Sequence, residues 1–118
     1  MKNYLYHYKA KVTEVYDGDT CTVEIDLGLH TFIKGEKVRL NRINAPEVRG
    51  AEKDRGILSR DFLREKILGK DIILATLKDK NEKYGRYLGE IFIDDGHREM
   101  MNINDLLVEK GFAVYQQY

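Results

Sequence analysis

The sequence of 118 residues predicts an α+β fold that is mainly β, in a single domain over residues 1–118. Several short runs are rich in Val, Thr and Ile and are bounded by turn residues, which is typical of strands. Two runs of helix-forming residues interrupt this series. The chain contains one proline, Pro46, and no repeat or Gly/Ser/Pro-rich linker, so we expect no second domain.

The N-terminal part of the chain is predicted to form three strands. Residues 9–15 and 20–26 flank Asp17-Gly18, and an Asp-Gly pair between two such runs favours a β-hairpin. A third strand with a glycine-associated bend is expected over residues 31–40.

The remainder of the chain completes a recognisable order of elements. Residues 52–68 predict a helix by their length and helix-forming composition, although their apolar pairs recur every five residues. Strands are expected over 71–78 and 86–93, and a short helix over 102–110. Five strands with a helix between strands 3 and 4 and a second short helix after strand 5 form an OB-fold Greek-key barrel. The open face of such barrels often binds oligonucleotides.

The charge of the chain is balanced overall but uneven along its length. There are 20 Lys plus Arg and 20 Asp plus Glu, yet residues 34–70 carry 11 basic and 6 acidic side chains. Cys21 is the only cysteine, which excludes an internal disulfide and a zinc site built on paired thiolates. No apolar run is long enough for a membrane span or a signal peptide, so we expect a cytoplasmic protein without a membrane partner.

Three short clusters carry residues suited to chemistry: Asp17-Gly18-Asp19-Thr20, the segment 39–47, and Lys83-Tyr84-Gly85-Arg86. Taken singly, they can be read as a hairpin turn, a solvated edge strand and an ordinary loop. Together they supply oxygen ligands for a hard divalent cation, two arginines that can bind a phosphate, and a carboxylate that can act as a base. Phosphodiester hydrolysis requires such a set.

The order and spacing of these clusters resemble the staphylococcal (micrococcal) nuclease family, also called the thermonuclease family, over residues 12–113. Asp-Gly-Asp-Thr is followed by Arg-x-x-x-Ile-x-x-Pro-Glu and then by Lys-Tyr-Gly-Arg. The run Asn-x-Leu-Leu-Val-x-x-Gly-Phe-Ala near the C-terminus also fits the second helix of that family.

The resemblance implies a calcium-dependent nuclease site. Asp19 matches the main calcium carboxylate, and Ala45 holds the position whose backbone carbonyl ligates the metal. Glu47 matches the general base, which contacts the water shell of the metal. The second calcium carboxylate of the family corresponds here to Asn44. Since charge count is a principal determinant of Ca²⁺ affinity, we predict that calcium binds more weakly than at a site with two aspartates.

The resemblance also implies the substrate contacts. Arg39 and Arg86 match the two catalytic arginines that bind phosphate. Four further positions match or lie near substrate-binding residues: Lys83, Tyr84, Leu88 and Tyr115.

The leading hypothesis is a monomeric, metal-dependent endonuclease that cleaves DNA and/or RNA with little sequence specificity. The alternative is a non-catalytic nucleic-acid- or protein-binding OB module. Glu47 favours the enzyme, since a binding module has no need of a carboxylate beside a polyanion, whereas Asn44 favours the module.

Overall fold

The computed structural model describes residues 6–81, 86–94, 96 and 99–116. Five long strands form the body of the fold: β1 (Tyr6–Asp17), β2 (Thr20–Asp26), β3 (Phe32–Leu40), β5 (Asp71–Asn81) and β6 (Tyr87–Asp94). Three short strands accompany them: β4 (Ile43–Asn44), β7 (Met100–Asn102) and β8 (Val114–Tyr115). A 3-10 turn, η1 (Gly50–Glu52), leads into the helix α1 (Lys53–Ile67), and the shorter helix α2 (Ile103–Glu109) follows β7.

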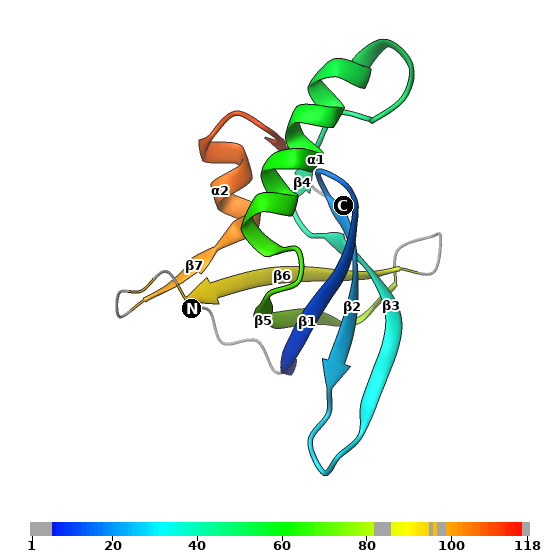
Figure 1. Ribbon diagram of the computed structural model, residues 1–118, viewed down its shortest axis with the longest axis vertical. Helices are drawn as coiled ribbons and strands as arrows, with labels where there is room; N and C mark the ends of the chain where they lie inside the picture. Colours follow the sequence, from blue (N-terminus) through cyan, green and yellow to red (C-terminus); the bar gives the residue numbers. More distant parts are fainter. Residues whose placement is uncertain (1–5, 82–85, 95, 97–98, 117–118) are drawn as a thin grey trace.

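The five long strands close into a barrel, as the sequence predicted. The sheet order is β3-β2-β1-β5-β6-β7, and an additional parallel pairing joins β3 to β6 (Figure 1). In this pairing Arg39 lies opposite Leu88. The helix between the third and fourth long strands and the helix after the fifth are also present, which confirms the OB-type arrangement. The short strands were not predicted.

Helix α1 lies over one end of the barrel and contacts β1 (Figure 1). Its buried positions are Gly56, Ser59, Leu63 and Ile67, which recur at intervals of three and four residues. Apolar periodicity does not reveal this stripe, because Gly56 has no side chain and Ser59 is small and polar. Leu58, which belongs to one of the apolar pairs, is 60% exposed.

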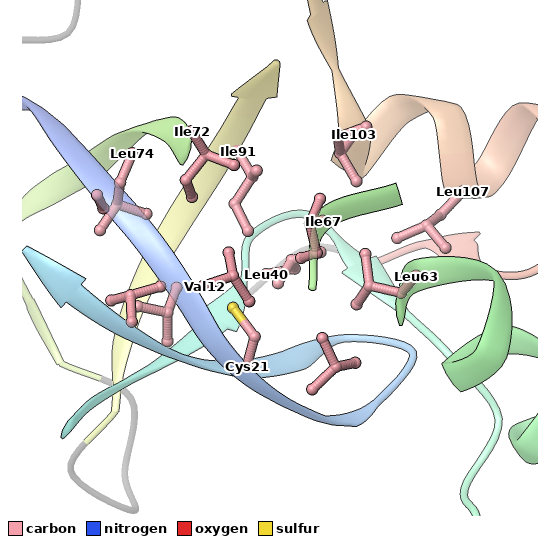
Figure 2. Close-up of a cluster of buried hydrophobic side chains, with 14 of the residues drawn as sticks. Val12, Cys21, Leu40, Leu63, Ile67, Ile72, Leu74, Ile91, Ile103 and Leu107 are labelled. Atoms are coloured by element: carbon pink, nitrogen blue, oxygen red, sulfur yellow. The ribbon is translucent and has the colours of Figure 1, made fainter. Parts of the chain in front are cut away.

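The core joins both helices to the barrel interior. Figure 2 shows Leu63 and Ile67 of α1 pointing toward Leu40, with Ile103 and Leu107 of α2 on the neighbouring side. All five side chains are buried. Both helices are therefore packed against the same hydrophobic core. None of the helices within the described ranges has the length and apolarity needed to cross a membrane.

Candidate active site

Asp19 stands at the end of the turn between β1 and β2 and is only 6% exposed. Its Oδ2 accepts a hydrogen bond from the Ala45 backbone N–H at 2.7 Å and lies 3.2 Å from Nη2 of Arg39. Its Oδ1 accepts from the Thr20 hydroxyl at 3.3 Å. The fold thus brings together three of the residues that the sequence predicted for the site: Asp19, Arg39 and Ala45.

Arg39 is buried at the end of β3, and protein oxygens surround its guanidinium. Nη1 donates to the backbone carbonyls of Leu40 at 2.8 Å and Ile43 at 3.0 Å. Nη2 donates to Oδ1 of Asn44 at 3.4 Å in addition to its contact with Asp19. These bonds fix both the arginine and the chain segment that turns from β3 into β4.

The charge balance at Asp19 favours additional positive charge. Burial raises the pKa of Asp19 to about 7, and the nearby Asp17 carboxylate raises it as well, although Arg39 and the Ala45 N–H act in the opposite direction. A cation bound at this carboxyl would favour its ionised form.

The available donors fit a hard cation by type. Asp19, Asn44, the Ala45 carbonyl and Glu47 offer oxygens only, which is the ligand set that Ca²⁺ prefers. Within the described part of the chain, however, no three His, Cys, Asp or Glu side chains are grouped so as to hold a metal. The donor set therefore fits calcium in chemistry but has few charges.

Glu47 lies on an exposed loop that α1 supports closely. A Cβ atom at Gly56 would overlap the Glu47 carbonyl and lie 2.8 Å from the Val48 nitrogen. The helix backbone thus touches the loop backbone directly at Gly56, and the Glu47 N–H lies 3.4 Å from Oε1 of Glu52. The backbone contact at Gly56 fixes the position of the Glu47 backbone.

The turn that carries Asp19 depends on a second close approach. A Cβ at Gly18 would lie 2.7 Å from Cβ of Ala45 and 2.8 Å from Cβ of Ser59. The Ser59 hydroxyl in turn donates to the Phe112 carbonyl at 2.6 Å. Two small residues of α1, Gly56 and Ser59, therefore allow the turn, the Glu47 loop and the C-terminal segment to meet.

Arg86 immediately precedes β6. Its Nη1 lies 3.4 Å from the Thr20 hydroxyl oxygen, and that hydroxyl contacts Asp19 on its other side. Arg86 also lines a hollow of about 470 Å³ together with Tyr16, Thr20 and Lys37. Thr20 belongs to the predicted Asp-Gly-Asp-Thr cluster, but sequence reasoning gave it no role. In the structure it connects the predicted metal carboxylate to the second arginine.

Comparison with known proteins identifies the family of the chain. A family model described as staphylococcal nuclease homologue matches residues 37–118, which is more than half of the chain. The chain belongs to the staphylococcal nuclease homologue family. Two Escherichia coli proteins described as uncharacterized endonucleases are 34% identical to it over 110 residues, or 92% of this chain and 62% of theirs. An uncharacterized protein of Methanocaldococcus jannaschii is 29% identical over 128 residues, covering 91% of this chain and 58% of the relative.

The chain thus spans about 62% of the length of the Escherichia coli relatives. Membership of the staphylococcal nuclease homologue family is the finding that applies to this chain itself.

Two of the remaining predicted substrate contacts of this nuclease homologue lie within the described residues. Leu88 is buried in β6, opposite Arg39. Tyr115 is 57% exposed, and its hydroxyl donates to Oδ1 of Asp105 at 2.9 Å. The hydrogen bond to Asp105 is the main cause that raises the pKa of Tyr115. Two predicted substrate contacts lie outside the described residues: Lys83 and Tyr84.

A buried ionic network beside the site was missed by sequence reasoning. Glu90 of β6 is fully buried, and its two oxygens accept from Arg42 at 2.9 and 2.7 Å and from the amides of Asn41 and Asn102 at 3.0 Å each. Nη2 of Arg42 also donates to Asp105 at 2.8 Å. The available signal was a glutamate within an otherwise apolar strand, because a buried charge requires partners.

This network holds the chain between β3 and the Glu47 loop. Arg42 has a φ of 69°, an uncommon backbone conformation for a residue with a side chain, and its carbonyl accepts from the Gln116 N–H at 2.8 Å. The next two residues pair with β8. The ion pairs of Arg42 thus stabilise the turn that leads to Asn44 and Ala45.

Proposed function

We propose that this domain is a metal-dependent endonuclease that hydrolyses phosphodiester bonds of DNA and/or RNA with little sequence specificity. The observation that carries the proposal is the convergence of Asp19, Arg39 and Ala45, with Thr20 linking Asp19 to Arg86. Family membership supports the same reaction class. The residues belong to four separate segments of the chain.

Each residue has a role that its position permits. Glu47 is exposed on a supported loop and acts as the general base, taking a proton from the attacking water. Arg39 and Arg86 stabilise the negative charge that develops on the phosphoryl oxygens. Arg39 is already rigid, so this arginine loses little freedom in the reaction.

Calcium is the proposed cofactor. Asp19, Asn44, the Ala45 carbonyl and Glu47 would hold it, and a bound Ca²⁺ supplies electrostatic polarisation of the phosphoryl oxygens. Because Asn44 contributes no negative charge, the proposed affinity is low. Asn44→Asp is expected to bind Ca²⁺ at least ~10-fold more tightly in an isothermal titration. An unchanged affinity would contradict the assignment of Asn44 to the metal site.

The decisive assay uses denatured DNA with Ca²⁺, with Mg²⁺ and with chelator, for the unchanged protein and for Glu47→Gln. We expect cleavage that depends on metal, and a loss of at least ~100-fold in the variant, as removing a general base typically causes. Glu47 is exposed, so the fold is expected to survive this change. Absence of cleavage in every metal, or equal cleavage by the variant, would refute the enzyme. Gel retention without cleavage would instead support the non-catalytic binding module.

A further inference from the structure

A basic groove lies next to the candidate active site, between the β1–β2 hairpin and α1. Its volume is about 630 Å³, and four cationic side chains line it: Arg49, Lys53, Arg60 and Arg64. Glu14 is the acidic residue of the lining. This local excess of positive charge contrasts with the formal net charge of zero for the whole chain.

The cations differ in how the protein holds them. Arg64 donates Nε and Nη2 to the Val15 carbonyl at 3.2 and 3.1 Å, which fixes it between helix and hairpin. Arg60 pairs with the adjacent Asp61 at 3.1 Å. Arg49 and Lys53 are exposed where the Glu47 loop enters α1. The groove is therefore lined by one cation that the hairpin backbone holds and by two exposed cations from the start of α1 and the loop before it.

The groove is continuous with the hollow that contains Arg86. Glu14, Tyr16 and Thr22 line both. Tyr16 is 55% exposed and stands between the two hollows. On the opposite side, Arg49 follows Glu47 by two residues. A chain held at Glu47 and Arg86 would meet this groove on leaving the site.

We propose that this groove, here called the flanking groove, binds phosphates of the substrate strand next to the cleaved one, with Tyr16 stacking on a base. This rests on the proposed nuclease function. Arginine binds phosphate oxygens through paired N–H groups, and exposed aromatic rings stack on unpaired bases of any sequence. The substrate class that fits is a single strand longer than the segment that occupies the active site.

The test measures binding without cleavage. In the Glu47→Gln background, we compare a labelled dinucleotide with a labelled oligothymidylate of about 12 nucleotides, within the range of an OB-fold site. The variant removes two charges of the flanking groove, Arg49→Ala with Lys53→Ala. The matched control removes two exposed charges outside it, Lys34→Ala with Lys110→Ala. All four side chains are exposed, and thermal melts check that each variant is folded.

We expect the groove variant to bind the long strand at least ~10-fold more weakly and its slope of log Kd against log salt to fall by about 1.4, the value for two phosphate contacts on a single strand. Dinucleotide binding should be unchanged. Equal losses for both lengths, or a loss matched by the control, would overturn the proposal. Equally tight, equally groove-dependent binding of a polyglutamate peptide would overturn the assignment to nucleic acid.

The two proposals fail separately. If the wild-type protein does not cleave DNA but the groove variant loses affinity for the long strand only, the nuclease proposal is refuted and the groove proposal is supported. Cleavage without the length-dependent loss refutes the groove alone.

Discussion

Gly56→Ala tests whether the contact between α1 and the Glu47 loop sets the catalytic geometry. In an ordinary helix interior this change stabilises by about 1 kcal/mol. Here the new Cβ would overlap the Glu47 carbonyl and approach the Val48 nitrogen to 2.8 Å. Backbone cannot rotate away as a side chain can, so the loop must move by about 1 Å, and a displacement of that size can reduce turnover about 100-fold. Overpacking should lower the free energy of unfolding by about 1–3 kcal/mol, which outweighs the gain in helix propensity.

The assay pairs turnover of denatured DNA with urea unfolding of the same preparation. Leu58→Ala is the control, because Leu58 lies on the exposed face of the same helix. We expect Gly56→Ala to lose about 100-fold in kcat while it remains folded. Wild-type turnover together with higher stability would show that the loop adapts freely, and would refute the claim that Gly56 positions Glu47.

Three further outcomes follow from buried groups. Glu90→Gln should lower the free energy of urea unfolding by about 3 kcal/mol, because it leaves Arg42 without its buried counter-charge; a loss below about 1 kcal/mol would contradict this. Ser59→Ala should cost about 1 kcal/mol through its lost bond to the Phe112 carbonyl, and an unchanged unfolding midpoint would argue against that bond. Burial raises the pKa of Cys21 to about 12, so iodoacetamide at pH 8 should label it only in urea, as mass spectrometry can check.

The fold was predictable where local signals decide it. Asp17-Gly18 marks the first hairpin, and the long strands and both helices appear close to their expected positions. The two-residue strands β4 and β8 were not predictable, because two residues show no periodicity and their pairing depends on the finished tertiary structure. The buried stripe of α1 escaped notice because Gly56 and Ser59 face the core through close backbone approach rather than apolar volume.

Candidate residues for the site could be proposed from the sequence, but the contacts between them could not. Asp19, Arg39 and Glu47 can be found from their clusters, yet the bond between Asp19 and the Ala45 N–H joins residues 26 positions apart. Thr20 received no role because its contact with Arg86 joins residues that are 66 positions apart. A role for such a residue depends on the register between strands, which sequence patterns do not specify.

The parallel pairing of β3 with β6 also affects the stage of folding at which the candidate site is assembled. It joins residues 38–40 to residues 87–89, the latter near the C-terminal quarter of the chain. Contacts of such long sequence separation form late, since the loop between them must first close. During synthesis, Arg39 would emerge well before Arg86 and remain without it until β6 had been made. The proposed enzyme would thus be inert as a nascent chain, and recovery of activity after refolding would report the closing of the barrel.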